Sequence, residues 1–198
     1  MKKSVKVLVI ITISLCLGSA ARSQLKLAAV NGIAPDIKKV IQDYPRQFHN
    51  LMGEVIVQNP QSTVYACNFK MKGAEEASIT KYSAANQYDI MSWQARLLTT
   101  EDFEEAKKKF KSLYKELNNL SVRMEEGVYF QLKGNYEEPV EEKKFTTVVF
   151  SVDNGGNKLK KLKVELQMVY EPMEWKVKVL VYDKEREDDE RGPRDESR

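Results

Sequence analysis

The side chains that could carry catalysis are few in this sequence. The chain of 198 residues contains one histidine, His49, and two cysteines, Cys16 and Cys67. A histidine-based triad needs a nucleophile and an acid gathered around the imidazole, and no such pairing is apparent for His49. A zinc site takes three or four ligands, usually histidine or cysteine. We therefore predict no metal and no cofactor, and we interpret His49 as a capping, surface or structural side chain.

Carboxylates are abundant, but they form no diagnostic pattern. Glutamate pairs at 125–126, 137–138 and 141–142 fall at predicted strand ends or in loops, which is typical of solvated surface. Residues 153–157 lack the ligand spacing and the closing glutamate of a calcium loop, so we predict a hairpin turn there. The sequence favours a protein that is not an enzyme. A carboxylate-dependent hydrolase of envelope or extracellular polymers is one alternative, because two facing carboxyl groups could do that chemistry.

The N-terminal residues have the order of a secretory signal peptide. Three lysines within the first six residues precede an apolar run, 7–17, and small residues follow at 18–21. This order predicts cleavage, and the run is short for a membrane span. We expect residues 1–21 to be removed and the protein to be exported, to the periplasm or out of the cell. Leu15 stands where a lipidation site has a small residue, which disfavours a lipid anchor on Cys16.

The net charge excludes one class of partner. The whole chain has 32 Lys and Arg against 29 Asp and Glu, a formal charge of +3. The three N-terminal lysines account for this excess, so the exported chain is formally neutral. A nucleic-acid binder needs surplus cations to displace counterions from phosphate, and we predict no nucleic-acid partner.

Cys67, the one cysteine left, is interpreted as a small core side chain, with a reactive thiol or an intermolecular disulfide as alternatives.

Two amphipathic segments predict helices. After an irregular lead over 22–34, Pro35 opens a first helix whose apolar stripe continues to Met52, and Pro45 is expected to kink or split it near Ile41–Tyr44. The second helix begins at 99–102, where a threonine hydroxyl caps it, and closes at Asn118-Asn119. The last residues, 184–198, are almost all charged and predict a disordered tail.

Alternation of apolar and polar residues predicts the strands. Turn residues separate many of them, and such short links force antiparallel pairing. We predict an α+β fold with two helices packed on one face of a largely antiparallel sheet of about seven strands, in one domain over 35–183. The strands expected are 65–71, 77–84, 88–98, 128–132, 145–152, 162–170 and 175–182.

The order of elements repeats. Met91-Ser92-Trp93 and Met173-Glu174-Trp175 open the last strand of each half. We predict a tandem duplication with half-modules 35–98, a helix and three strands, and 99–183, a helix and four strands. A two-fold pseudosymmetric sheet of this kind resembles, in topology only, the tandem modules of secreted β-lactamase inhibitor proteins; no motif ties the chain to that family.

The two faces of the strands predict different roles. Trp93 and Trp175 lie on apolar faces and are expected in the core. Aromatic and lysine side chains on the other faces suggest a surface that holds a protein or peptide, so the leading interpretation is a binding protein that uses an open sheet face or an edge strand. The second alternative is a carrier with an apolar pocket between helices and sheet. The candidate binding residues are Tyr82, Tyr88, Lys176, Lys178, Leu180 and Tyr182.

Overall fold

Strands that follow one another through short links tend to pair with each other, and this rule accounts for most of the sheet. The computed structural model describes residues 32–83, 89–125, 127–152 and 159–184, which all belong to one compact unit of the chain. Nine strands are present in these ranges, and every neighbouring pair is antiparallel. They are β1 (Met52–Gln58), β2 (Ser62–Cys67), β3 (Glu76–Ser83), β4 (Asp89–Thr100), β5 (Ser121–Arg123), β6 (Tyr129–Lys133), β7 (Phe145–Val152), β8 (Leu162–Glu171) and β9 (Glu174–Asp183).

The strand order shows how the two halves of the chain meet. The order is β1-β2-β3-β4-β9-β8-β7-β6-β5, so each half forms its own run of consecutive strands. The pairing of β4 with β9 joins the two runs, with Trp93 opposite Val181 and Arg96 opposite Lys178. This pair brings together residues far apart in the sequence, and it lies at the centre of the sheet.

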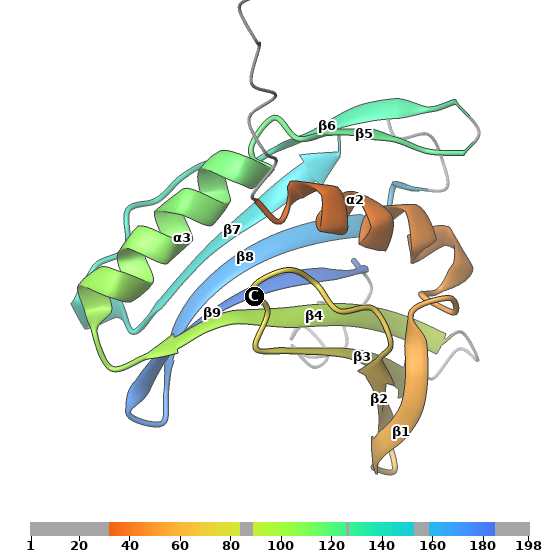
Figure 1. The fold of residues 1–198 in the computed structure, drawn as a ribbon, viewed down its shortest axis with the longest axis horizontal. Coiled ribbons are helices and arrows are strands. Elements are labelled where there is room, and N and C mark those ends of the chain that lie inside the picture. The colour runs from red at the N-terminus through yellow and green to blue at the C-terminus, as the bar shows by residue number, and fades with distance from the viewer. Residues whose placement is uncertain (1–31, 84–88, 126, 153–158, 185–198) are drawn as a thin grey trace, which may run out of the picture. The chain divides into compact units, whose positions relative to one another are not determined.

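Both helices lie on the same face of the sheet (Figure 1). They are α2 (Ala34–Asp43) and α3 (Phe103–Leu117), and short 3-10 turns form η1 (Tyr44–Arg46) and η2 (Glu141–Lys143). The second helix has the expected end at Asn118, but its cap differs from the prediction. Asp102, rather than a threonine hydroxyl, caps it, because its Oδ1 accepts hydrogen bonds from the backbone N–H groups of Glu104 and Glu105 at 2.8 and 3.3 Å.

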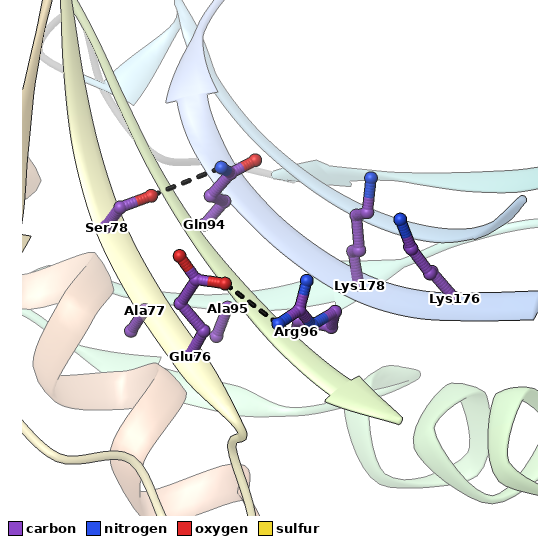
Figure 2. Close-up of a pocket in the computed structure, with 8 residues that line it drawn as sticks. All are labelled: Glu76, Ala77, Ser78, Gln94, Ala95, Arg96, Lys176 and Lys178. Carbon is purple, nitrogen blue, oxygen red and sulfur yellow. Dashed lines mark hydrogen bonds and ion pairs between the residues drawn. The ribbon is translucent and has the colours of Figure 1, made fainter. Parts of the chain in front are cut away.

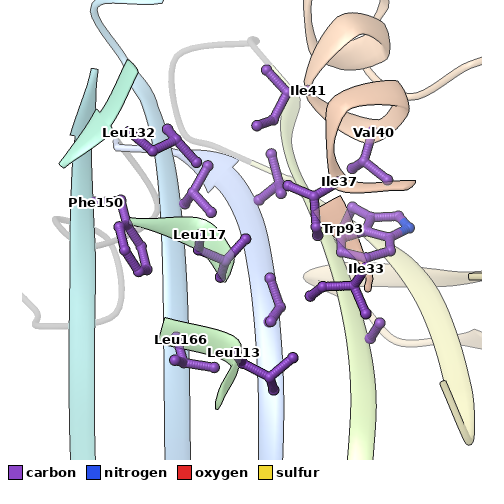
Figure 3. Close-up of a cluster of buried hydrophobic side chains, with 14 of the residues drawn as sticks. Ile33, Ile37, Val40, Ile41, Trp93, Leu113, Leu117, Leu132, Phe150 and Leu166 are labelled. Atoms are coloured by element: carbon purple, nitrogen blue, oxygen red, sulfur yellow. The ribbon is translucent and has the colours of Figure 1, made fainter. Parts of the chain in front are cut away.

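The core fills the space between the helices and the inner face of the sheet. Trp93 and Trp175 are 0% and 2% exposed, which confirms their predicted place in the core. Figure 3 shows Ile37 and Val40 of α2 beside Trp93, and it shows Leu113 and Leu117 of α3 nearer Leu166 and Phe150. Burial of each such aliphatic side chain contributes about 1.5–3 kcal/mol, and the helices supply Ile37, Val40, Ile41, Leu113 and Leu117.

The first helix ends within the range where Pro45 was expected to kink or split it, but the predicted helical stripe from there to Met52 is wrong. The helix ends at Asp43, and Pro45 falls in the 3-10 turn that follows, because proline has no N–H to continue the ladder. Two residues in left-handed conformation, Gln47 and Phe48, then reverse the chain with φ of 55° and 58°. Phe48 is fully buried. Its spacing therefore matched a buried helical stripe, although the backbone there is not helical. His49 lies in this turn and is exposed.

The strand count of seven is also wrong, because β1 and β5 were missed. The residues Val55, Ile56 and Val57 of β1 are all apolar, so they show no alternation of apolar and polar residues. Met52, the first residue of β1, had been assigned to the apolar stripe of the predicted first helix. β5 has three residues, which is too short for a period-two pattern. The remaining seven strands lie within a few residues of their predicted positions.

Several predictions fall outside the described residues: the signal peptide at 1–21, the tail beyond Lys184, the turn at 153–157 and Tyr88. Within the described residues, none of the helices combines the length and apolar character needed to cross a membrane. Cys67 is half-buried against the core, and its thiol lies 3.4 Å from the carbonyl oxygen of Phe69.

Candidate binding site on the outer sheet face

Side chains alternate across the strands, so every second residue points away from α2 and α3. We call this side of the sheet the outer face. One row of directly opposed residues crosses it from β3 to β7. The row consists of Glu76, Arg96, Lys178, Gln167 and Thr147.

Two cations of this row face each other without an intervening residue. Arg96 on β4 is the direct antiparallel partner of Lys178 on β9. Like charges in directly opposed positions destabilise a sheet, so this pair needs negative charge nearby. Lys176, two residues along β9, adds a third cation on the same face.

Glutamates supply that negative charge from the edges of the cation cluster. The Arg96 guanidinium lies 2.9 Å from a carboxylate oxygen of Glu76 and 3.1 Å from one of Glu75. One oxygen of Glu171, the last residue of β8, lies 2.9 Å from Lys178 Nζ and 3.9 Å from Lys176 Nζ. Two lysines therefore share one carboxylate.

The cations surround a small pocket of about 100 Å³ (Figure 2). The side chains of Lys176, Lys178 and Arg96 are 17%, 21% and 34% exposed, so all three are partly removed from water. Its volume is below the roughly 300–1,000 Å³ of small-molecule sites, which suits a single side chain or a small anion. The lining residues are Glu76, Ala77, Ser78, Gln94, Ala95, Arg96, Lys176 and Lys178.

Hydrogen bonds hold the edge of this pocket in place. Gln94 donates to the Ser78 hydroxyl at 3.2 Å.

Burial raises the pKa of the Glu75 carboxyl, but hydrogen bonds from Thr99 and Arg96 outweigh this effect and leave the pKa below its ordinary value of 4.5. Glu75 is therefore ionised at neutral pH and holds the Arg96 guanidinium at 3.1 Å.

A second polar cluster on the outer face surrounds Glu165, which is 9% exposed. Its carboxylate accepts three hydrogen bonds, from the hydroxyl of Thr147 at 2.6 Å, the amide of Gln167 at 2.8 Å and the hydroxyl of Tyr182 at 2.8 Å. All three donors are neutral. A buried carboxylate that is satisfied in this way fixes its neighbours, so Tyr182 has a structural role in this cluster.

The structure treats the predicted binding residues differently. Lys176 and Lys178 lie together and line the pocket. Tyr82 is half-buried on the outer face of β3. Leu180 and Tyr182 also point to the outer face but are 3% and 2% exposed, so their predicted exposure is wrong. Cross-strand neighbours and, for Tyr182, the bond to Glu165 account for part of this burial.

The sequence analysis did not identify four polar residues that line the pocket: Arg96, Gln94, Glu76 and Ser78. They come from β3 and β4, and they meet the lysines only because β4 pairs with β9. The alternation around Trp93 already placed Gln94 and Arg96 on the polar face. Nothing local in the sequence identified β9 as the neighbour of β4.

The arrangement brings together three cations and several hydrogen-bond donors, and the carboxylates of Glu75, Glu76 and Glu171 offset the positive charge. In the described ranges, no group of three or more His, Cys, Asp or Glu side chains is placed to hold a metal ion. Comparison with known proteins adds no assignment: no family model matches the chain, and no curated protein or solved structure is significantly similar to it.

Proposed function

We propose that this chain is an exported, non-enzymatic interaction protein whose outer face binds an acidic side chain of a protein or peptide partner. The observation that supports this function is the direct opposition of Arg96 and Lys178 at a pocket that Lys176 also lines. A carboxylate seated between these cations would relieve their repulsion and accept hydrogen bonds from each.

The ion pairs of Glu171 do not prevent such binding, while Glu75 and Glu76 stay paired with Arg96. Glu171, which compensates both lysines, is 46% exposed, and exposed ion pairs contribute only about 0–1 kcal/mol. An incoming carboxylate can replace Glu171 at small cost. It would meet cations that are already partly desolvated, where charge interactions are stronger than in bulk water.

The surroundings favour a polypeptide over a free small anion. Phe145 and Val149, on the outer face of β7, are 46% and 38% exposed. An extended segment that places its acidic side chain in the pocket could cover these apolar groups as well. Arginine is enriched among the residues that dominate binding energy at protein interfaces.

The proposal is tested with two labelled heptapeptides of alternating threonine and valine that differ only in a central glutamate or glutamine. Fluorescence anisotropy should show the glutamate peptide binding at least about tenfold more tightly, a difference of about 1.4 kcal/mol. The double variant Lys176→Ala/Lys178→Ala should abolish this preference. A double variant that removes the same charge from the other side of the molecule, Lys108→Ala/Lys111→Ala on α3, should keep it.

Equal affinity for the two peptides would refute the proposal. So would a preference for glutamate that survives in Lys176→Ala/Lys178→Ala. Higher salt should weaken binding of the glutamate peptide, because ions screen charges that remain partly exposed.

Export is the second part of the proposal. Lysines, an apolar run and small residues at 1–21 support signal-peptide cleavage. Mass spectrometry of the protein recovered from the exported fraction should give an N-terminus between residues 21 and 24. An intact Met1 in that fraction would contradict it.

We also propose that the chain arose by tandem duplication. Each half contains a helix followed by consecutive antiparallel strands, α2 with β1–β4 and α3 with β5–β9, and the last strands of the two halves pair. This order supports a duplication in which the second half has one more strand than the first.

A further inference from the structure

The strand β1 forms one edge of the sheet and has unusual composition for that position. Its side chains at Val55, Ile56 and Val57 are 54%, 57% and 45% exposed. β2 is its neighbour on one side, and β1 is the first strand in the sheet order. An edge strand presents backbone N–H and C=O groups that another strand can pair with.

Natural proteins usually protect such edges. Lysine, proline, inward charges and bulges are common devices. The β1–β2 ladder does contain register shifts on either side of Val55, but Met52–Gln58 contains no lysine and no proline, and Glu54 is its single charged residue. The irregular register is therefore the one such device present in β1, and the exposed apolar side chains remain accessible to a further strand.

The sequence of β1 indicates which strand fits. Glu54-Val55-Ile56-Val57-Gln58 reads almost the same in both directions. If a second copy pairs antiparallel with its centre at Ile56, isoleucine faces isoleucine and Val55 faces the equivalent of Val57. Glu54 then faces Gln58 of the second copy, so that an amide donor meets a carboxylate and no like charges are opposed.

We propose that two copies of this chain associate through β1, as an antiparallel pair of edge strands related by a two-fold axis through Ile56. Two-fold dimers use the same surface patch on both subunits, and a near-palindromic strand satisfies this requirement. Directly opposed residues on neighbouring strands have Cβ atoms about 4.5–5.5 Å apart. The proposal is independent of the outer-face pocket, which lies on β3, β4 and β9.

Sedimentation equilibrium tests the dimer. Each protein is purified in the form that the cells produce, after any cleavage of the N-terminal segment. The natural protein should be dimeric at about 50 μM, because this concentration exceeds a dissociation constant of a few micromolar. Ile56→Lys should be monomeric at the same concentration with an unchanged circular dichroism spectrum, since Ile56 is exposed. Met173→Lys changes a side chain that is 78% exposed in the β8–β9 turn and should remain dimeric. A monomeric natural protein, or a dimeric Ile56→Lys variant, would overturn the proposal.

Cysteine cross-linking tests the register. In a background lacking both natural cysteines, Ile56→Cys should form a disulfide-linked dimer in air, because the two thiols lie opposite each other at the axis. Glu54→Cys should form it at least about tenfold more slowly, because position 54 faces position 58 and the two thiols are then separated by four residues, roughly 13 Å along the strands. Equal rates would overturn the register centred on Ile56.

Discussion

Removing one hydroxyl from the outer face should measurably destabilise the fold. Tyr182 is 2% exposed, and its hydroxyl donates to the Glu165 carboxylate at 2.8 Å. A hydrogen bond to a charged group contributes about 1.5–3 kcal/mol. The change Tyr182→Phe keeps the ring and deletes only this donor, and the carboxylate retains its bonds from Thr147 and Gln167. We therefore expect the free energy of unfolding to fall by about 1.5–3 kcal/mol.

Urea denaturation followed by far-UV circular dichroism measures this loss. The midpoint should fall while the slope with urea stays constant, since the surface exposed on unfolding does not change. Thermal unfolding should shift down by roughly 3–12 °C, from about 2–4 °C per kcal/mol for a chain of this size. The control is Tyr129→Phe, which deletes the same atom from a tyrosine that is 59% exposed. If both variants lose less than about 0.5 kcal/mol, as surface substitutions do, the buried bond does not stabilise the fold and the reasoning fails.

Two further predictions concern packing and pH. A Cβ at position 134 would lie 2.7 Å from Cγ1 of Val148, so Gly134→Ala should lower the free energy of unfolding by about 1–3 kcal/mol through overpacking; an unchanged urea midpoint would contradict this. The pKa of Glu75 is lowered because bonds from Thr99 and Arg96 outweigh the effect of burial. Its stabilising contribution is therefore present above pH 4.5, the ordinary value, and is lost as pH falls through the lower folded pKa. The wild type should be more stable than Glu75→Gln at pH 7, and this difference should shrink at pH 3; a constant difference would show that Glu75 has no such role.

The second helix and seven of the nine strands in the described residues could be read from the sequence because their signals are local. In α3 the spacing of Ala106, Phe110, Leu113 and Leu117 gives a single buried stripe, and all four residues are buried. The short links between strands fix antiparallel pairing whatever the rest of the chain does. Both signals depend on residues close together in sequence.

The first helix shows where local reading fails. Phe48 continues the helical spacing, yet it reaches the core from a left-handed turn after Pro45. Asp43 holds this turn, since its carboxylate accepts a hydrogen bond from the backbone N–H of Asn50 at 3.1 Å. An apolar residue at the right spacing reports burial, but it does not report the backbone conformation that achieves burial.

The candidate site was only half visible for a related reason. Lys176 and Lys178 could be placed on a polar strand face, and Arg96 could be placed on another. Leu180 and Tyr182 could be assigned to the same face of β9 as the two lysines. Their burial could not be predicted, because it depends on neighbours from other strands.

The sequence by itself therefore determined which segments form most helices and strands and which face of each strand is apolar, because period and turn chemistry act over a few residues. Only the tertiary structure decided that β4 lies beside β9, that this contact opposes Arg96 to Lys178, and that β1 is left at an edge. Strand neighbours are chosen by burial of the shared core across the whole chain, and that energy depends on distant residues together. The chemistry of the outer face is a consequence of that choice.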